Sequence, residues 1–367
     1  MLQESCSNIL DKKTTNMVKI IDPLKDQRWD DFVLNHKDST IYHHSRWTEI
    51  IQKTYHYEPY YFILEDDNSR IKAGIPFFLI KSRITGTRLV SLPFSDFCDV
   101  LTDDKDDFKR LFDAVIKNHI DSKASYVEFS LKRQDLNFKG YNFQILDCYR
   151  NHVLELSGTL EDLMDKFHKN CIQRNIKKAL KSHITVVTGR DERDVKIFYN
   201  LYVMTRRNHG LPPQPYRFFQ NIWQFLKSKG MIRILISYDE NRPVAGVMIL
   251  HFKDTGYYLY GGCNSNYLEH KPNHLLLWKA IEICYQKGQK YFDFGRTSVE
   301  NQGLMDFKRR WGTVEYKLPY YYYSNSIRNE LLVNRSTRSH NFISKVLKRM
   351  PIPLLRLGGT LIYGHIG

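Results

Sequence analysis

The stretch from Gly288 to Gly312 contains a lysine on a helix face that is otherwise apolar. The pattern predicts a helix from about Gly303 to Trp311, with Gly312 in the position of a C-cap glycine. One face of this helix carries, at spacings of three and four residues, Leu304, Phe307, Lys308 and Trp311. Because a lysine on an apolar face is costly, either an anionic group meets Lys308 or its ammonium reaches water past Trp311. In the first case the ammonium could stabilise negative charge that develops in a reaction.

The segment before this helix supplies candidate acid–base and binding groups. Tyr291–Phe294 is predicted to be a short buried strand that ends at Gly295. The polar loop that follows carries Arg296, Ser298 and Glu300. An attacking amine must lose a proton, so a base within reach is required. The candidate bases are Asp293, Glu300 and His274, and Asp293 could instead hold Arg296.

Other catalytic arrangements are not recognisable in the sequence. There is no nucleophile elbow, no Cys–His arrangement and no metal-ligand cluster, which favours direct transfer and predicts no metal. The cysteines are scattered without a C-x-x-C pair, so they are expected to be free thiols: Cys6, Cys98, Cys148, Cys171, Cys263 and Cys284.

Residues 159–182 are predicted to form one basic amphipathic helix. Its basic positions include Lys166, Lys169, Arg174, Lys177, Lys178 and Lys181. A solvated helix face is one interpretation of this pattern, and the density of like charge equally indicates a phosphate-binding surface. In the second interpretation the donor phosphates contact Arg174, Lys177 and Lys178.

The order of predicted elements recurs after about 170 residues, which indicates two copies of one domain. The first copy has strands at 60–64, 73–80, 88–92 and 126–130, with a helix at 108–120 before the last strand. The second has strands at 232–238, 244–252, 257–261 and 291–294, with a helix at 273–286. Further helices are predicted at 26–34, 45–55, 192–209 and 218–229. The predicted class is α/β, with mixed sheets in both copies.

Composition indicates a folded protein of two domains and a basic tail. The 367 residues are 42% hydrophobic and 14% aromatic, and neither a signal peptide nor a bilayer-spanning run is recognisable, so a cytoplasmic location is expected. Residues 1–150 hold 22 basic and 23 acidic residues, whereas the remainder holds 33 basic and 17 acidic residues. The net charge of the whole chain is +15. The second half is therefore expected to meet a phosphate-bearing donor, RNA or an anionic membrane, with no DNA partner predicted.

The expected boundaries are a lead-in at 1–16, domains at 17–150 and 151–325, and a tail at 326–367. The tail combines seven basic residues and one acidic residue with an apolar end. Either it contacts a membrane at the inner face or it docks on the protein as a C-terminal helix.

Several of these segments resemble the Fem-type transferases. The residues that carry the resemblance are Phe292-Asp293-Phe294-Gly295-Arg296, Gly303, Phe307-Lys308-x-x-Trp311-Gly312 and Arg174-Asn175-Ile176-Lys177-Lys178-Ala179. The family consists of tandem GNAT-fold enzymes that include the aminoacyl-tRNA-dependent ligases of peptidoglycan bridges. His209-Gly210-Leu211-Pro212 and the segment from Tyr258 to Asn264 resemble variants found beside surface-polysaccharide genes. The chain departs from the family in lacking the long coiled-coil arm of some ligases.

The resemblance implies an acyl- or aminoacyltransferase acting on an amine of a cell-envelope or surface-saccharide precursor. Acyl-CoA or aminoacyl-tRNA would be the co-substrate, with no bound cofactor. In the family the Phe-Lys pair lies at the acyl donor, which corresponds to Phe307 and Lys308. Tyr258 and Tyr260 either line a sugar- or peptide-binding cleft or pack in the core, and Asn264, His209 and His274 complete the predicted substrate site. The alternative is a non-catalytic RNA-binding or membrane-associated scaffold on the same fold.

Overall fold

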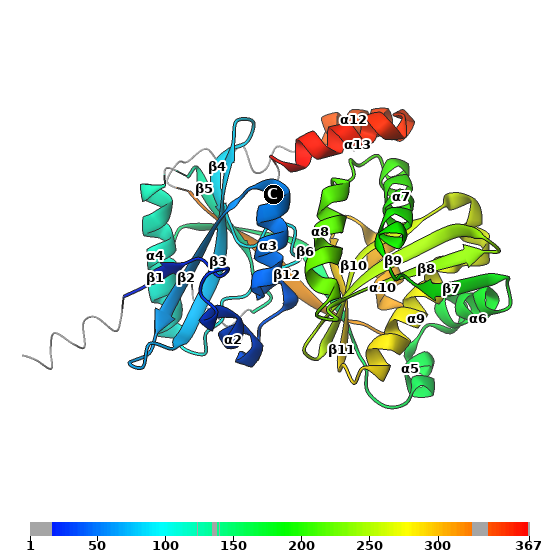
Figure 1. Ribbon diagram of the computed structural model, residues 1–367, viewed down its shortest axis with the longest axis horizontal. Helices are drawn as coiled ribbons and strands as arrows, with labels where there is room; N and C mark the ends of the chain where they lie inside the picture. The colour runs from blue at the N-terminus through cyan, green and yellow to red at the C-terminus, as the bar shows by residue number, and fades with distance from the viewer. Residues whose placement is uncertain (1–16, 123, 134–137, 139, 325–336, 366–367) are drawn as a thin grey trace, which may run out of the picture. The chain divides into compact units, whose positions relative to one another are not determined.

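The computed structural model describes residues 17–122, 124–133, 138, 140–324 and 337–365. The expected lead-in at 1–16 and the start of the tail at 326–336 lie outside these ranges. The chain divides into two compact units, each described here by itself (Figure 1). Unit 1 comprises the described residues within 1–147 and 318–327, and unit 2 those within 148–317 and 328–366. Residues 318–324, which fall within the predicted second domain, thus belong to unit 1.

Unit 1 contains one mixed sheet with strands in the order β1-β2-β3-β4-β5-β12. Its strands are β1 (Lys19–Ile21), β2 (Glu58–Glu65), β3 (Ile71–Ser82), β4 (Gly86–Val90), β5 (Tyr126–Ser130) and the end of β12 (Val314–Tyr323). Its helices are α2 (Arg28–Asn35), α3 (Ser45–Tyr55) and α4 (Lys105–Asp121), with a short 3-10 turn η1 (Ile41–His43). All pairs are antiparallel except β4 with β5, which follow the crossover helix α4.

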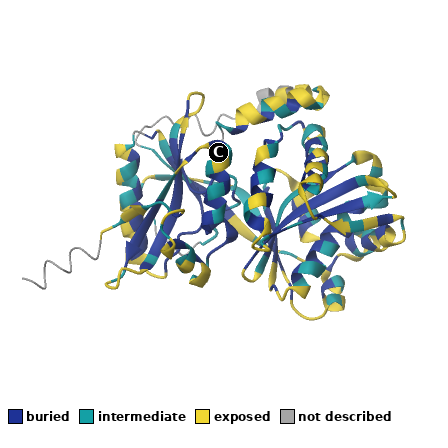
Figure 2. Ribbon diagram, viewed as in Figure 1, coloured by how far each residue is buried: buried dark blue, intermediate teal, exposed yellow. Residues whose placement is uncertain are grey.

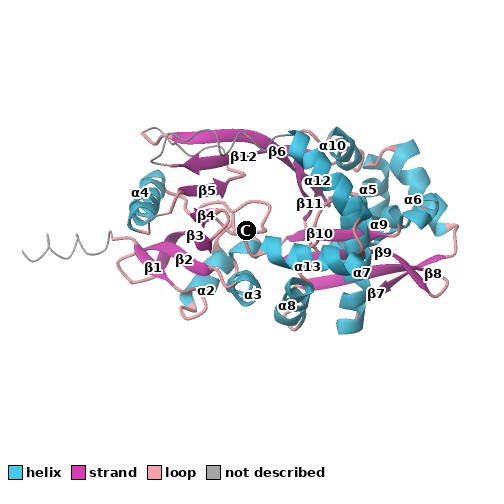
Figure 3. Ribbon diagram, turned by 90° about the horizontal axis from the view of Figure 1, so that it is seen from above, coloured by secondary structure: helices cyan, strands magenta, loops and turns pink. Residues whose placement is uncertain are grey.

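Unit 2 contains a second mixed sheet with strands in the order β6-β11-β10-β9-β8-β7. Its strands are β6 (Phe143–Glu155), β7 (Ile184–Thr188), β8 (Ile232–Asp239), β9 (Arg242–Phe252), β10 (Thr255–Cys263) and β11 (Tyr291–Ser298). Its longer helices are α7 (Glu192–Asn208), α8 (Tyr216–Lys227), α9 (Pro272–Gln286), α12 (Thr337–Arg349) and α13 (Ile352–Tyr363). Its shorter ones are α5 (Leu160–Lys166), η2 (Lys169–Gln173), α6 (Arg174–Leu180), η3 (Ser265–His270) and α10 (Gln302–Arg309). Helices pack on both faces of the sheet (Figure 3).

The predicted repeat and mixed sheets are confirmed. In unit 1 the antiparallel strands β2, β3 and β4 are followed by α4 and by β5, which runs parallel to β4. In unit 2 the antiparallel strands β8, β9 and β10 are followed by α9 and by β11, which runs parallel to β10. Apolar residues concentrate on the strands and the inward faces of the helices of each unit (Figure 2).

One glycine recurs at the same place in both copies for a packing reason. A Cβ on Gly74 of β3 would lie 2.6 Å from the ring of Trp29 in α2. A Cβ on Gly246 of β9 would lie 2.9 Å from the ring of Phe198 in α7. In each unit an aromatic side chain from the preceding helix therefore rests directly on the third strand, where even a methyl group would collide with it.

The final strand of each sheet comes from elsewhere in the sequence. The strand that follows β5 along the chain is β6, and it pairs with β11 of unit 2. The strand that follows β11 is β12, and its end, Tyr320–Tyr323, pairs with β5 of unit 1. Each half of the sequence thus supplies one strand to the other unit, and neither β6 nor β12 is among the predicted strands.

One further expectation is corrected. The single helix predicted for 159–182 is broken at Phe167, whose backbone is extended because its ring is buried against Trp278 and Trp311. His168 then caps the next segment, since its Nδ1 accepts the Cys171 N–H at 3.3 Å.

In the tail, the described helices α12 and α13 pack on α7, as the docked-helix alternative expects. A membrane contact of the tail stays a prediction.

Candidate active site

The two parallel strands of unit 2 separate halfway along their length. β10 and β11 pair from Thr255 with Tyr291 to Tyr257 with Asp293, and no pairing between these fully described strands extends beyond that point. The register of β10 against β9 shifts between Tyr258 and Tyr260. The register of β11 against β6 shifts between Asp293 and Arg296. Such bulges turn backbone groups away from the ladder, often beside active sites.

The bulge in β11 is held by Asp293. Its Oδ1 accepts the Gly295 N–H at 2.7 Å and the Asn151 Nδ2–H at 2.7 Å, and its side chain is buried. Gly295 has a φ of +73°, in the left-handed region that favours glycine. The predicted end of the strand at Gly295 is therefore wrong, because β11 bulges there and pairs with β6 again from Arg296 to Ser298.

The bulge directs two carbonyl groups at the ammonium of Lys308. Lys308 Nζ donates to the carbonyl oxygens of Gly295 at 2.8 Å and Arg296 at 3.2 Å. The side chain is 5% exposed, so the alternative in which the ammonium reaches bulk water is wrong. The partner that compensates for burying this cation is a pair of backbone carbonyls. Leu304, expected on the packed face of α10, is 39% exposed, and Met305 is buried in its place.

A buried imidazole lies beside Lys308. The Thr313 hydroxyl donates to the Lys308 carbonyl at 3.1 Å and lies 3.5 Å from Nδ1 of His152 in β6. Burial and the nearby Lys308 charge lower the pKa of His152 to about 4, so this imidazole is neutral at neutral pH. A neutral His152 spares Lys308 a second positive charge inside the protein.

The helix face around Lys308 is aromatic. Phe307 meets the ring of His274 edge-on at 5.6 Å, and His274 stacks near Trp311 at 6.2 Å. His274 lies in the first turn of α9, where Asn175 Nδ2 donates to its Nε2 at 3.3 Å. Burial, with Lys271 nearby, lowers the pKa of His274 to about 4. This aromatic group forms one wall of a surface hollow.

The hollow has a volume of about 560 Å³ and connects Phe307 and His274 to a set of cations. Its basic lining residues come from three elements and their flanks: Arg174, Lys178, Lys271 and Arg310. None of these four forms an ion pair with any described residue. Four uncompensated cations around a partly apolar floor suit a ligand with phosphate groups next to a less polar part.

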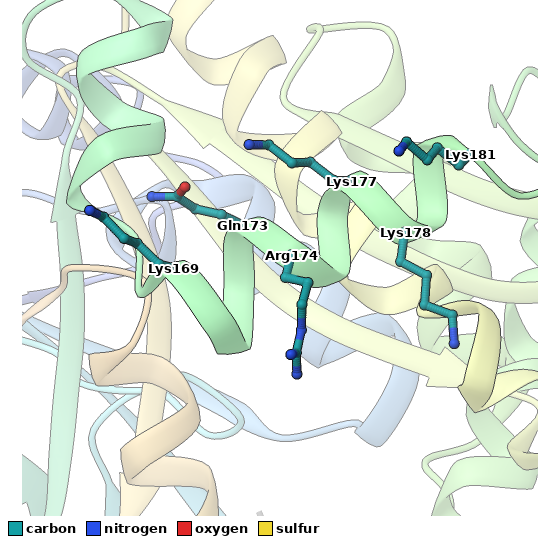
Figure 4. Close-up of a pocket in the computed structure, with 6 residues that line it drawn as sticks. All are labelled: Lys169, Gln173, Arg174, Lys177, Lys178 and Lys181. Atoms are coloured by element: carbon teal, nitrogen blue, oxygen red, sulfur yellow. The ribbon is translucent and has the colours of Figure 1, made fainter.

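A second hollow of about 580 Å³ extends along η2 and α6 (Figure 4). Arg174 and Lys178 extend to one side of the helix in this view, whereas Lys177 extends in another direction. Lys177 lines this second hollow together with Lys169 and Lys181 but does not line the hollow beside Phe307. The three residues predicted to bind donor phosphates all line this second hollow, and Arg174 and Lys178 also line the hollow beside Phe307.

The two tyrosines of β10 pack in different surroundings because the bulge separates them. Tyr258 packs against the buried cluster that includes Leu276 and Ile281 of α9, and burial raises its pKa to about 12. Tyr260 lies among aromatic rings of α7 and α8, and its hydroxyl donates to Gln214 Oε1 at 3.3 Å. Core packing therefore accounts for Tyr258, while Tyr260 belongs to a half-buried polar and aromatic group.

The side chains of the other predicted site residues have different surroundings. Ser298 Oγ accepts the Glu300 N–H at 3.4 Å at the end of β11, and the Glu300 side chain is exposed. The Arg296 guanidinium lies 5.1 Å from the ring centre of Tyr149. Asn264 caps η3 by accepting the Asn266 N–H.

His209 ends α7 on the side that faces the tail. Its carbonyl accepts the Ser344 hydroxyl of α12 at 3.5 Å. Burial, with Arg206 and Lys348 nearby, lowers the pKa of the His209 imidazole.

Four residues near Lys308 are missed by the sequence analysis: Asn151, His152, Lys271 and Arg310. The polar pair Asn151-His152 directly precedes the apolar pair Val153-Leu154. This pattern could have indicated a strand that begins with buried polar side chains. One group of potential metal ligands lies in unit 1, where oxygen and nitrogen atoms of His36, Asp38 and Asp103 fall within 4.8 Å. Lys37 and Arg133 already pair with its carboxylates.

Residues 166–309 match the family model described as an acetyltransferase (GNAT) domain. Lipid II:glycine glycyltransferase of Staphylococcus haemolyticus is 30% identical over 89 residues, which cover 23% of this chain and 21% of that protein. The same-named protein of Staphylococcus epidermidis is 32% identical over 76 residues, which cover 19% of this chain and 18% of that protein. The chain thus aligns with about a fifth of the length of these curated relatives.

Solved structures match over most of the chain. The crystal structure of FemX superposes with a TM-score of 0.69 at 16% identity, over 84% of this chain and 98% of that chain. A tandem GNAT protein from the clavulanic acid biosynthesis pathway matches with a TM-score of 0.54 at 8% identity, over 84% of this chain and 98% of that chain. At such identities these matches show the fold: two GNAT units in tandem.

The repeated sheet and the matched domain therefore define a tandem GNAT protein. The chain is similar over a short stretch of sequence to the glycyltransferases and in its fold to FemX, which confirms the predicted resemblance to the Fem-type proteins. Within the described residues, no helix combines the length and the apolar character that crossing a bilayer requires.

Proposed function

We propose that this protein is an acyltransferase that moves an aminoacyl or acyl group from an activated donor to an amine of a cell-envelope or surface-saccharide precursor. The observation that carries the proposal is Lys308, a buried ammonium fixed by two carbonyls of the β11 bulge beside the Phe307–His274 wall. The GNAT domain match and the glycyltransferase relatives support the same reaction class. Aminoacyl transfer to a cell-wall precursor is the form that the relatives favour.

The chemistry assigned to Lys308 is electrostatic. The acceptor nitrogen attacks the acyl carbon, the carbonyl oxygen becomes an oxyanion, and the donor oxygen or sulfur leaves as the carbonyl re-forms. A positive charge fixed before the reaction stabilises that oxyanion without having to reorganise. Because the two carbonyls hold the ammonium in place, its position does not depend on the ligand.

The proton of the attacking amine needs a separate acceptor. Asp293 is engaged by Gly295 and Asn151, and the Nε2 of His274 is engaged by Asn175. Glu300 makes no side-chain hydrogen bond with any described residue, so we propose it as the base. Glu300→Gln should then lower turnover, which the transfer assay described below would measure.

The donor would enter through the hollow lined by Arg174, Lys178, Lys271 and Arg310. Both donors carry phosphates, close to the acyl ester in aminoacyl-tRNA and separated from the thioester by the pantetheine arm in acyl-CoA, and the four cations suit either. The acceptor would be an amine of a peptide or saccharide precursor. Such an acceptor favours a cytoplasmic location at the inner membrane face.

The test is transfer of a labelled acyl group, followed by mass spectrometry of amine acceptors, with charged tRNA and acyl-CoA supplied separately. Lys308→Met should lower turnover by about a hundredfold to a thousandfold, as does loss of an oxyanion donor elsewhere. Lys287→Met, which removes an exposed lysine after α9, is the matched control and should leave turnover unchanged. Retained turnover in a folded Lys308→Met protein would remove Lys308 from the mechanism. Binding of tRNA without transfer from either donor would favour a non-catalytic RNA-binding protein.

A further inference from the structure

The C-terminal helix α13 is apolar on two sides, and only one of them is covered. Its buried residues, spaced four apart, are Leu355, Gly359 and Tyr363. Its most exposed apolar residues, spaced three and four apart, are Leu354, Leu357 and Leu361, at 57%, 59% and 64% exposure. On a helix these two rows point in nearly opposite directions. A helix that is apolar on both sides normally has both sides covered.

The covered side is fixed to α7 by specific contacts. Arg206 donates to the Tyr363 hydroxyl at 3.0 Å, and Arg356 donates to Asn200 Oδ1 at 2.8 Å. A Cβ on Gly359 would lie 2.1 Å from the Pro213 carbonyl oxygen, so the helix lies directly against that loop. The uncovered leucine row therefore has a fixed orientation on unit 2.

The preceding helix α12 also carries exposed apolar side chains and adds charge. Ile343 and Val346, spaced three apart, are 56% and 45% exposed. The basic side chains of Lys345, Lys348 and Arg349 are also exposed on this helix. Of the twenty exposed large hydrophobic residues in the described chain, six fall within residues 343–362. We call α12 and α13 together the tail hairpin.

The charge of the tail hairpin selects its partner. No Asp or Glu occurs from Leu331 to Gly367, whereas six Lys and Arg residues do. Two copies of this chain meeting through the hairpin would bring their cations together, which opposes self-association. Leucine side chains beside lysines and arginines are the combination that binds the boundary between lipid headgroups and acyl chains.

We propose that the tail hairpin is a membrane-docking surface for anionic phospholipid bilayers. Leu354, Leu357 and Leu361 enter the interface, while Lys345, Lys348 and Arg349 contact lipid phosphates from the flank of α12. This docking is peripheral and independent of the chemistry at Lys308, and it would hold unit 2 at the surface that carries a membrane-bound acceptor. The surface rests on exposure and charge alone, so it can be tested without the enzymatic activity.

The experiment is flotation of the full chain with phosphatidylcholine vesicles, with or without phosphatidylglycerol. Leu354→Ser/Leu357→Ser/Leu361→Ser should lower partitioning onto anionic vesicles by about tenfold or more. Its matched control is Ile20→Ser/Ile84→Ser/Ile120→Ser, which removes three exposed apolar side chains of unit 1 and should bind as the unchanged protein does. Lys345→Gln/Lys348→Gln/Arg349→Gln should weaken binding by about fivefold per charge, and high salt should do the same.

Three outcomes would overturn the proposal. The leucine variant could bind anionic vesicles as well as its control does. The protein could bind neutral and anionic vesicles equally, or bind neither. The leucine variant could instead convert a dimer to a monomer without changing vesicle binding, which would assign the surface to a second copy. Because every replaced side chain is exposed, unchanged thermal melting should accompany each variant. Transfer to a soluble acceptor should stay unchanged in the leucine variant.

Discussion

The two units share one strand order but differ where their parallel strands end. In unit 1, the loop after β4 closes onto β5: Ser91 N donates to Glu128 O at 2.8 Å, and Cys98 N donates to Ser130 O at 2.9 Å. In unit 2, the loop after β10 bonds instead to β9, through Asn264 N and Val244 O at 2.8 Å. The strands β10 and β11 separate there, and both carry bulges. The ends of the parallel strands are therefore joined by loop hydrogen bonds in unit 1, whereas in unit 2 they separate.

The polar groups of unit 1 at this position are built into its core. Asp99 Oδ1 accepts the Lys132 and Arg133 N–H groups, and Cys98 Sγ lies 3.4 Å from Nε2 of His43. All three side chains are buried, and burial raises the pKa of the Cys98 thiol well above its usual range. A Cys–His contact thus exists in the fold although the sequence gives no sign of it, but the thiol is neither accessible nor ionised. Both units thus have the same strand order, and the bulges and loop hydrogen bonds decide in which unit the parallel strands separate.

The largest effect expected from this comparison concerns donor binding at unit 2, where the parallel strands separate. Arg174→Gln/Lys178→Gln should raise the KM for the donor by about tenfold or more for each charge, with little change in kcat, since a charge-assisted contact to phosphate contributes about 1.5–3 kcal/mol. Lys177→Gln is the matched control, because Lys177 does not line the hollow beside Phe307. Steady-state kinetics with varied donor would measure both. An equal rise in KM for the control would show that the charge of α6 acts without regard to position.

The pH dependence of stability should have opposite signs for one buried group in each unit. Burial raises the pKa of Asp99 to about 6, so the folded state holds this proton more tightly than the unfolded chain. Its contribution is therefore greatest below pH about 4 and falls, by up to about 3 kcal/mol, as the pH rises to about 6. The pKa of His152 is lowered to about 4, so the unfolded chain binds that proton first. Its contribution is present above pH about 6.5 and is lost, by up to about 3 kcal/mol, as the pH falls toward 4.

Urea unfolding of Asp99→Asn and His152→Gln across this pH range would measure the two slopes. Relative to the unchanged protein, Asp99→Asn should lose the part of the stability that declines with rising pH. His152→Gln should lose the part that increases with rising pH. If the stability of both variants depended on pH in the same way, the opposite pKa shifts of Asp99 and His152 would be contradicted.

The smallest effect concerns the packing that both copies share. Gly74→Ala and Gly246→Ala should each lower the free energy of unfolding by about 1–3 kcal/mol, because the new methyl group collides with Trp29 or Phe198. Gly358→Ala in α13 is the control, since a Cβ there meets nothing within 4 Å. Chemical denaturation would compare the three. A large cost in one copy and none in the other would show that the matching glycines do not have matching roles.

Much of the repeat could be predicted because it depends on local patterns. The predicted bounds of α3 and β5 agree with the structure. The helix predicted to reach Trp311 instead ends at Arg309 with Arg310 as its C-cap, and Gly312, with a φ of +72°, lies two residues beyond that cap. The strands β6 and β12 were missed because their pairing partners are distant in sequence and their exposed and buried residues do not alternate regularly. The break at Phe167 was missed because helical periodicity continues through it, whereas the ring is drawn out of the helix by burial against two tryptophans.

The candidate site could likewise be predicted only in part. A lysine on an apolar helix face is visible in the sequence, and that was enough to single out Lys308. What compensates for its charge is not visible, because Gly295 and Arg296 offer their carbonyls only after a bulge that Asp293 and Asn151 stabilise. Likewise, α-helical spacing shows that Arg174 and Lys178 share a face, but only the fold brings Lys271 and Arg310 to that face.

The sequence by itself determined the duplicated strand order, the basic character of the second half and the isolated lysine, since each depends on residue type and spacing along one segment. Tertiary structure decided in which unit the parallel strands separate, where β6 and β12 pair and which surface the tail covers. These depend on contacts between segments far apart in the chain, such as Asn151 with Asp293 or Arg206 with Tyr363. Local patterns cannot encode such contacts, because the free energy that selects them is gained only when both segments are in place.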